Sequence, residues 1–356
     1  MKTTPLKQVI GIDVAKATLS WSLGSLNLDL KKEFKTFPDV SNNPQGFKKI
    51  LGIIKKQENE QLVVVMEATG VYHEALAFFL YENGIAVSIM QSGRVKRYAQ
   101  SLDQRSKTDA LDSRMLAMMG CERTLPLWKP PGKTLRELKS LSRERGSLVK
   151  EKQVLKNRLH ATETAAFSNK REIRRNGQRL KLIEKQLEEI EEEMEALVRQ
   201  DAELSQKLQY LKSIPGISFI SAATIVGETL GFDGITNAKQ LTSYAGYDVI
   251  LKESGSFRGK TRISKKGNRR IRGILHMPSM TAVRSNPTLK VFYERLKPNK
   301  IKPMIALVAV QRKLLILMYI LWKNESTYDP KYEQKKQQDQ KDLAAQDRFS
   351  EALNLP

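Results

Sequence analysis

The stretch "QLVVVMEATG" (Gln61–Gly70) decides the fold of the first third of the chain. Its apolar run, Leu62–Met66, shows no polar alternation, which predicts a central strand covered on both faces. The strand ends at Glu67. Tyr72–Asn83 then shows a helical pattern closed by Gly84, a residue favoured just after a helix. A buried strand followed by a helix indicates an α/β domain.

Further elements lie on both sides of this strand. Upstream, "QVIGIDVAK" (Gln8–Lys16) predicts a second buried strand with Asp13 at its exit. We expect strands over Leu19–Leu23, Lys32–Phe37 and Ile85–Met90, and helices over Pro44–Lys56 and Arg94–Leu102. The order of three strands, helix, strand, helix, strand and helices fits a ribonuclease-H-like fold over residues 8–125.

Two acidic residues stand three apart in "RSKTDALDSR" (Arg105–Arg114). An unbroken helical pattern follows, so Asp109 and Asp112 should share one helix face. Two like charges on one face repel, and a bound cation is the usual reason to tolerate them. A solvated helix N-terminus, where Asp is favoured by the macrodipole, is the alternative.

These two carboxylates gain a function when combined with Asp13 and Glu67. Both of the latter lie where predicted strands end, which is where active sites of open α/β sheets are found. Hard oxygen ligands suit Mg²⁺, and a metal pair can clamp the attacking and leaving oxygens in phosphoryl transfer. We therefore predict that Asp13, Glu67, Asp109 and Asp112 hold one or two Mg²⁺ ions. In the alternative, Glu67 caps the next helix and Asp13 only ends a strand.

Composition points to a nucleic-acid partner. The 356 residues include 61 Lys or Arg and 39 Asp or Glu, a net charge of +22, which indicates a polyanionic ligand. A lone cysteine, Cys121, excludes intrachain disulfides and Cys-based zinc sites. Met1–Lys7 lacks the apolar segment of a signal peptide. Polar residues interrupt the apolar run Met304–Trp322, which predicts a core helix. We expect a cytoplasmic protein.

Residues 126–212 are predicted to form a linker and a long antiparallel coiled-coil arm. After the Pro/Gly linker, Leu135–Phe167 shows a helical pattern, and Asn176–Gly177 is a turn signal. The second helix carries an apolar seam in steps of three and four. The seam comprises Leu180, Ile183, Leu187, Ile190, Met194, Leu197, Asp201, Leu204, Leu208 and Leu211. Such a hairpin either packs only on itself or links protomers. We favour the second alternative, in which the arm joins protomers into a dimer or tetramer.

Residues 213–330 are predicted to form a mostly helical domain, followed by a polar tail over 331–356. Pro215–Gly216 and two short helices resemble a helix-hairpin-helix, whose turn can contact phosphates through backbone N–H groups. Between Leu251 and Lys313 there are 17 Lys or Arg but two acids. Its predicted nucleic-acid-binding residues are Arg258, Lys260, Arg262, Lys265, Lys266, Arg269 and Arg270. Ser254 lies in a Gly- and Ser-containing loop there, and such serines are most often turn residues.

Several motifs resemble one known family. "GIDVAK", "MEATGVYHEAL" and "SKTDALDSRMLA" look like the Asp-Glu-Asp-Asp transposases of the insertion-sequence-110 family, whose first domain resembles the RuvC Holliday-junction resolvase. "YAG", "SGS", "RISKKGNRRIR" and "SNP" are similar to the family's second domain. The family's acidic set falls on Asp13, Glu67, Asp109 and Asp112, and its serine nucleophile falls on Ser254. After "YAG" the family usually has Leu and a nearby Pro, whereas this chain has Tyr247-Asp248-Val249-Ile250. The loop geometry near Ser254 could therefore differ from the family's, and Ser256 is the alternative nucleophile.

The resemblance implies a recombinase that excises and inserts its own element. The family's bridge RNA would pair with donor and target DNA, and Ser254 would attack a phosphodiester with help from Mg²⁺. One rival is a metal-dependent junction-resolving nuclease that uses water as the nucleophile. The other is a non-catalytic nucleic-acid scaffold.

Overall fold

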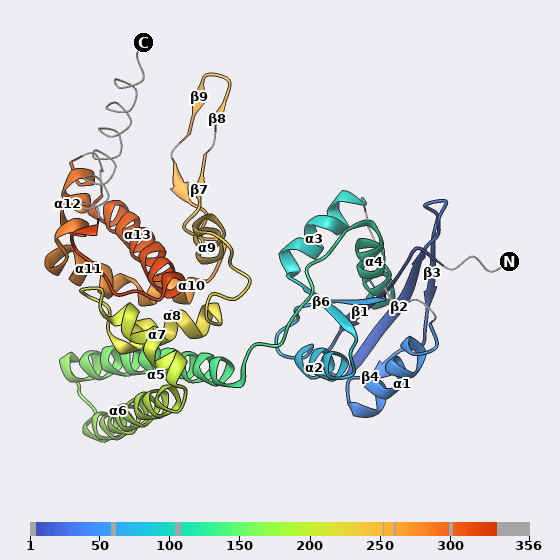
Figure 1. Cartoon of the computed structure of the whole chain (residues 1–356). Helices are drawn as coiled ribbons and strands as arrows, with labels where there is room; N and C mark the ends of the chain where they lie inside the picture. Colours follow the sequence, from blue (N-terminus) through green and yellow to red (C-terminus); the bar gives the residue numbers. More distant parts are fainter. Residues whose placement is uncertain are drawn as a thin grey trace, which may run out of the picture. The chain divides into compact units, whose positions relative to one another are not determined.

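The computed structural model describes residues 5–57, 62–103, 108–251, 253–259, 261–298 and 302–332, with the backbone alone of Arg258. The predicted polar tail lies outside these residues except for its first two positions. The chain divides into two compact units, Met1–Pro130 and Pro131–Pro356, and each is described by itself (Figure 1).

A mixed β-sheet organises the first unit. Its strands run in the spatial order β3-β2-β1-β5-β6, with the short β4 beside β2. The pairs β1–β2 and β2–β3 are antiparallel, whereas β1–β5 and β5–β6 are parallel. The strands are β1 Lys7–Val14, β2 Thr18–Leu26, β3 Lys32–Thr36, β4 Val40–Ser41, β5 Val63–Glu67 and β6 Ala86–Met90. The predicted order of strands and helices is found with one addition, the two-residue β4 before α1, which was not predicted. The unit is mixed α/β.

Helices cover both faces of this sheet (Figure 1). On one face, α1 (Pro44–Ile54) and α2 (Glu74–Glu82) pack on the alternate strand residues Ile10, Ile12, Val64 and Met66. On the other face, α3 (Ser92–Ser101) and α4 (Asp109–Glu122) pack on Val9, Val65 and Met90. Because strand residues alternate between faces, Asp13 shares the α3–α4 face with Val9, and Glu67 shares it with Val65.

The backbone of α4 lies directly on β1. A Cβ atom added at Gly11 would come within 2.1 Å of the Ser113 carbonyl oxygen, and one at Gly120 within 2.4 Å of a Val9 methyl carbon. These two glycines therefore permit the close approach of helix and strand. The contact pairs also show that α4 runs antiparallel to β1, because the late Gly120 meets the early Val9.

A helical hairpin begins the second unit. It consists of α5 (Lys133–Thr164) and α6 (Lys170–Arg199), joined by Ala165–Asn169. The predicted turn at Asn176–Gly177 is wrong, because both residues lie inside α6 and Asn176 is buried. A turn-favouring pair is tolerated inside a helix when packing holds it there. The true connection uses the Asn169 side chain, which caps α6 by accepting from the Arg171 and Glu172 N–H groups.

The predicted seam from Leu180 to Leu211 does not follow one continuous helix. Asp201 interrupts it by capping α7 (Ala202–Lys212), where its carboxylate accepts from the Leu204 N–H. Asp201 is the one polar residue among the predicted seam positions, and its role as the N-cap of α7 explains why an Asp stands there. Ile190 and Met194 are buried in the core of the same chain. The seam thus packs largely within the protomer.

Truncating the seam should test this packing. Met194 is 0% exposed, so we expect Met194→Ala to lower the free energy of unfolding by about 2–5 kcal/mol through lost contacts and a cavity. Leu182→Ala on the same helix is the matched control, because Leu182 is 56% exposed and should change stability by about 0.5 kcal/mol or less. Urea denaturation measures both. Equal stability of the two variants, with a smaller mass for Met194→Ala in light scattering, would instead place the seam between chains.

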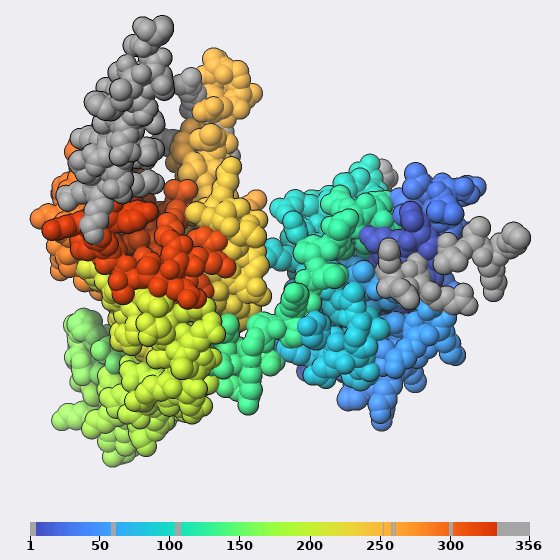
Figure 2. Space-filling view, in the orientation of Figure 1, coloured from blue at the N-terminus to red at the C-terminus, as the bar shows by residue number. Residues whose placement is uncertain are grey.

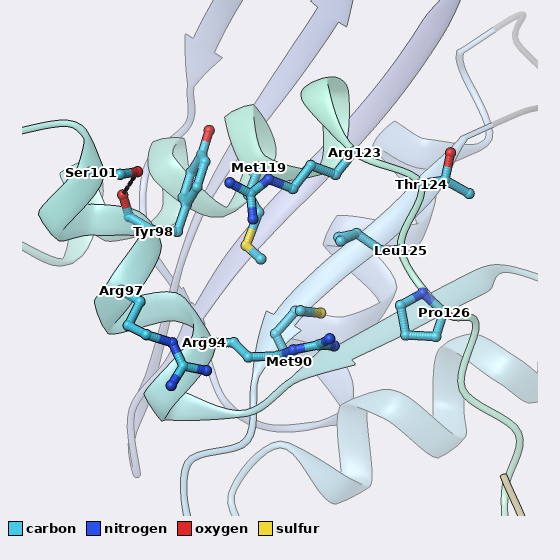
Figure 3. A pocket seen from close by; sticks show the side chains of 10 residues that line it. All are labelled: Met90, Arg94, Arg97, Tyr98, Ser101, Met119, Arg123, Thr124, Leu125 and Pro126. Atoms are coloured by element: carbon cyan, nitrogen blue, oxygen red, sulfur yellow. Dashed lines mark hydrogen bonds between the residues drawn. The ribbon is translucent and has the colours of Figure 1, made fainter. Parts of the chain in front are cut away.

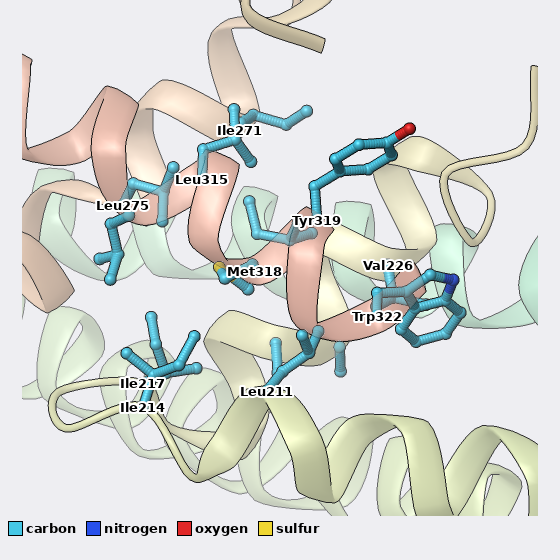
Figure 4. Packing of buried hydrophobic residues seen from close by; sticks show 14 of the residues in the cluster. Leu211, Ile214, Ile217, Val226, Ile271, Leu275, Leu315, Met318, Tyr319 and Trp322 are labelled. Atoms are coloured by element: carbon cyan, nitrogen blue, oxygen red, sulfur yellow. The ribbon is translucent and has the colours of Figure 1, made fainter. Parts of the chain in front are cut away.

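The remaining helices enclose the core of the second unit (Figure 4). They are α8 Phe219–Thr229, α9 Ala238–Ala245, α10 Arg269–Ile274, α11 His276–Ser285, α12 Pro287–Leu296 and α13 Pro303–Asn324. By length and composition α13 could cross a membrane. Leu314, Leu315 and Met318 of this helix are instead fully buried in the unit's core, which confirms the predicted core helix.

The segment predicted as a helix-hairpin-helix has its two helices, α8 and α9, in the expected places. The Pro215–Gly216 turn before them packs inward, because a Cβ at Gly216 would lie 2.9 Å from the Ala282 nitrogen of α11. Gly216 has φ +98°, a conformation that favours glycine. A phosphate contact through this turn stays a prediction.

Candidate active site

The sheet places Asp13 and Glu67 next to each other. β1 and β5 are parallel, and Ile12 is aligned with Met66, so the following residues, Asp13 and Glu67, extend from the same edge. Adjacent strands lie about 4.8 Å apart, and both side chains lie on the α3–α4 face. Glu67 also pairs with Met90 on β6.

The start of α4 adds the other two carboxylates. Thr108 caps the helix by accepting from the Leu111 N–H, and Asp109 and Asp112 occupy the first turn. Since α4 runs antiparallel to β1 with Ser113 against Gly11, this first turn lies beside the end of β1. Asp109 is exposed, whereas Asp13, Glu67 and Asp112 are half-buried. We call these four residues the acidic cluster.

Electrostatics reveal the coupling of the acidic cluster. Burial, followed by the charges of Asp109, Asp112 and Glu67, raises the pKa of Asp13 to about 6. Repulsion among carboxylates destabilises the ionised form, and a divalent cation would relieve it. Within the described residues, no three His, Cys, Asp or Glu side chains adopt a geometry that could hold a metal ion. The donor chemistry thus fits a divalent ion, while the oxygens are not gathered around one point.

Ser254 stands at the tip of a β-hairpin in the second unit. It closes β8 (Glu253–Ser254), which pairs antiparallel with β9 (Phe257–Arg258). Gly255 has φ +55° at the first central position of the two-residue turn, as in a type II′ turn. Glu253 through Phe257 are all exposed. Ser254 therefore flanks the turn, as expected of a serine in this loop, and its side chain is exposed to solvent.

The base of the hairpin is held firmly. β7 (Val249–Ile250) pairs with β10 (Arg262–Ile263), and the Ser264 hydroxyl donates to the Asp248 carboxylate. A Cβ at Gly267 would lie 2.5 Å from the Tyr244 carbonyl oxygen. The Gly of the "KKGN" motif thus permits the return strand to pack on the end of α9.

A buried carboxylate that sequence reasoning missed anchors this base. The Glu228 side chain is 0% exposed and accepts from Arg143 Nε at 2.8 Å, from Arg143 Nη2 at 3.1 Å and from Asn268 Nδ2 at 2.7 Å. Asn268 caps α10, and the Tyr244 hydroxyl donates to the Glu228 carbonyl. Glu228 therefore joins α5, α8, α9 and α10 below the hairpin. An acid within an apolar run was the available signal.

The pKa of Glu228 makes the second unit sensitive to acid. Burial alone would raise this pKa, but the hydrogen bonds from Arg143 and Asn268 outweigh it and lower the pKa below 4.5. Ionised Glu228 is thus favoured by folding. Its contribution is complete above about pH 4.5 and is lost as the pH falls through the folded pKa.

We expect Glu228→Gln to lower the free energy of unfolding at pH 7 by about 2 kcal/mol, because it removes a buried charge that accepts hydrogen bonds from the partly exposed Arg143 and from Asn268. The difference between the variant and the original chain should shrink as the pH falls below about 4.5. Urea denaturation across pH 3–7 measures this, with the exposed Glu188→Gln as the control. A constant difference across that range would assign the loss to packing and exclude the charge.

The predicted nucleic-acid-binding residues gather on and below the hairpin. Arg262, Lys265, Lys266, Arg269 and Arg270 are exposed. Arg270 also lies 3.8 Å from the Glu228 carboxylate. Lys260 and the Arg258 side chain lie outside the described residues. In Figure 2 the hairpin stands out from the helical body of its unit.

Two family models match the chain. The Asp-Glu-Asp-Asp transposase model of IS110 matches residues 10–167, and the model of the transposase IS116/IS110/IS902 family matches residues 208–294. The chain belongs to the IS110 family of transposases. It is accordingly an enzyme, a DNA transposase. The two matches include all four members of the acidic cluster and Ser254.

Named relatives and solved structures add detail to the IS110 assignment. The chain is 27% identical to a pilin gene-inverting protein of Moraxella lacunata and 26% identical to that of Moraxella bovis. Each comparison covers 91% of this chain and 98% of the relative. RuvC of Thermus thermophilus, solved with a Holliday junction substrate, is 16% identical with a TM-score of 0.26, covering 34% of this chain and 99% of RuvC.

Proposed function

We propose that this IS110 transposase excises and inserts its insertion sequence by a covalent serine mechanism. The coupling of four carboxylates around Asp13 is the observation that carries the proposal. A set of carboxylates at a strand edge, whose charges add to burial in raising the pKa of Asp13, is suited to a divalent cation. A divalent ion, with Mg²⁺ as the expected species, would be held by Asp13, Glu67, Asp109 and Asp112 and would supply charge stabilisation at a phosphate.

Ser254 is the proposed nucleophile. Its Oγ would form a bond to phosphorus while a bond from phosphorus to a deoxyribose oxygen breaks. The serine proton passes to a base, and the departing oxygen takes up a proton to become a free hydroxyl. A hydroxyl of another strand then attacks the phosphoserine and releases Ser254. Each phosphodiester lost is replaced by another phosphate ester, so the exchange needs no ATP.

A bridge RNA is the proposed guide. The family resemblance motivates this assignment, and the net charge of +22 supports binding to RNA and DNA backbones together. Sequence would be read by base pairing with donor and target DNA, which leaves the protein to hold backbones. Sequencing the RNA that co-purifies with the chain tests the assignment. Recovery of RNA unrelated to the element would count against it.

A junction-resolving nuclease is the second candidate. The acidic cluster lies in the first unit and Ser254 in the second, so the first unit alone could serve a reaction with water as the nucleophile. The two functions differ in one product. The recombinase yields a protein–DNA adduct that survives denaturation, whereas the nuclease yields free DNA ends.

We also propose that an oligomer of this chain carries out the reaction.

A further inference from the structure

An arginine-lined pocket occupies the α3–α4 face of the first unit (Figure 3). It has a volume of about 330 Å³, at the lower end of the range of small-molecule sites, about 300–1,000 Å³. The lining includes Met90, Arg94, Arg97, Tyr98, Met119 and Arg123. We call it the arginine pocket. Its floor is apolar, and its charged groups are all positive.

Two elements supply the cations. Arg94 and Arg97 lie three apart on α3, so they project from one helix face. Arg123 follows the end of α4, and its guanidinium lies over the Tyr98 ring at 4.8 Å from the ring centre. This stacking holds the charge of Arg123 at the pocket wall. Figure 3 shows α3 and the end of α4 presenting these side chains to the same space.

No salt bridge pairs the arginines of the pocket with an acid among the described residues, although the charge of Glu122 acts on the adjacent Arg123. Glu122, adjacent to Arg123, is already engaged by Lys32 and by the Tyr98 hydroxyl at 2.7 Å. Across the described parts of the chain, no salt bridge involves Arg94, Arg97 or Arg123. All three arginines are exposed. Unpaired guanidinium groups that converge on one pocket suit a phosphate, which they can bind in a bidentate manner.

One end of the arginine pocket lies beside the acidic cluster. Met90, just before α3, marks this end, whereas Arg123 follows the last turn of α4 and lies at the opposite end of that helix from Asp109 and Asp112. Its floor residue Met90 is the strand partner of Glu67 in the parallel pair β5–β6, and paired residues project from the same face of a sheet. Met90 packs with Val65 and Tyr98 on the α3–α4 face, the face that also carries Glu67 and Asp13. Met90 itself is buried, so a strand whose phosphate lies at the acidic cluster would continue over the start of α3 toward Arg94 and Arg97.

We propose that the arginine pocket binds the phosphodiester backbone of a polynucleotide strand next to the phosphate that reacts. This rests on the proposed function, because it takes the acidic cluster as the reaction site. Backbone phosphate is common to DNA and RNA. The pocket fixes the path of the strand and reads no bases, since guanidinium–phosphate contacts carry no sequence information.

The test measures binding of fluorescently labelled oligo(dT) and oligo(U) 20-mers to the full chain. In Arg94→Ala/Arg97→Ala, both residues lie on the exposed side of α3, where alanine favours the helix. We expect binding about tenfold weaker at 100 mM salt, as lost charged hydrogen bonds imply. The slope of log affinity against log salt should fall by about 1.4, for two contacts on a single strand.

The matched control is Lys48→Ala/Lys49→Ala. These two exposed lysines lie on α1, on the opposite face of the sheet, and the variant removes the same charge. Its affinity should stay within twofold of the original chain. A larger effect on oligo(dT) than on oligo(U) would assign the pocket to DNA, and the reverse to RNA. Equal losses in the arginine and lysine variants would show a general charge effect and overturn the proposal.

Failure of this proposal can be separated from failure of the proposed function. Unchanged oligonucleotide binding by Arg94→Ala/Arg97→Ala, with recombination abolished in Asp109→Asn, would remove the arginine pocket and keep the acidic cluster. Full recombination by Asp109→Asn would remove the proposed function itself, whatever the binding result.

Discussion

Ser254→Ala is expected to abolish the covalent protein–DNA adduct while RNA and DNA binding stay within twofold of the original chain. The substitution removes the only oxygen of an exposed side chain at a hairpin tip, so it should not disturb folding. A denaturing gel of labelled DNA incubated with the chain, its co-purified RNA and Mg²⁺ measures the adduct. Ser254→Cys should restore a trace, because a thiolate is a competent nucleophile.

Ser256→Ala is the matched control for this experiment. Ser256 lies in the same turn and is also exposed, but it is not aligned with a residue of β8 or β9. The Ser256→Ala variant should form the protein–DNA adduct at the level of the original chain. If Ser256→Ala loses the adduct and Ser254→Ala keeps it, the nucleophile is Ser256. If neither substitution matters and free DNA ends accumulate, the nuclease with water as nucleophile is correct.

Asp13→Asn should reduce recombination by about a thousandfold. The substitution keeps the shape of the side chain but removes the carboxylate at the centre of the acidic cluster. Loss of several kcal/mol of metal-based charge stabilisation corresponds to that factor. DNA binding should be unchanged or slightly stronger, because one repelling charge near the phosphate is gone. Recombination of a donor and a target plasmid measures the loss.

Two comparisons sharpen the Asp13 experiment. Asp29→Asn removes the same charge at an exposed site before β3 and should recombine normally. Raising the Mg²⁺ concentration should recover part of the activity of Asp13→Asn if metal affinity is what was lost. Full activity of Asp13→Asn at low Mg²⁺ would contradict the assignment of the acidic cluster.

The element order and the acidic cluster could be predicted because they depend on local patterns. The apolar run before Glu67 identifies a central strand, and strand ends in a parallel pair meet at one edge. The sequence did not show what brings α4 to that edge. Gly11 and Gly120 let the helix lie on β1, but a glycine in the sequence does not identify the segment that packs against it.

The features that the sequence mispredicted or missed depend on long-range packing, which local patterns do not show. Asn176–Gly177 carries a strong local turn preference, but burial of Asn176 against the neighbouring helix overrides it. Glu228 stands in an apolar run, where no pattern identifies its partners Arg143 and Asn268, which are far away in sequence. The arginine pocket escaped notice for the same reason, because Arg123 belongs to a different element from the other two arginines.

The hairpin of the second unit is anchored at its base and unsupported at its tip. Glu228 and the glycines near α9 fix where the hairpin begins, whereas Glu253 through Phe257 stand in solvent. If Ser254 is the nucleophile, as we propose, bound nucleic acid must therefore supply the free energy that orients it for attack. Such a transposase would be idle by default, because without a correctly assembled substrate the proposed nucleophile would face only water. An element that excises and inserts itself within a host genome would gain from this, because unscheduled DNA breaks harm the cell that carries it.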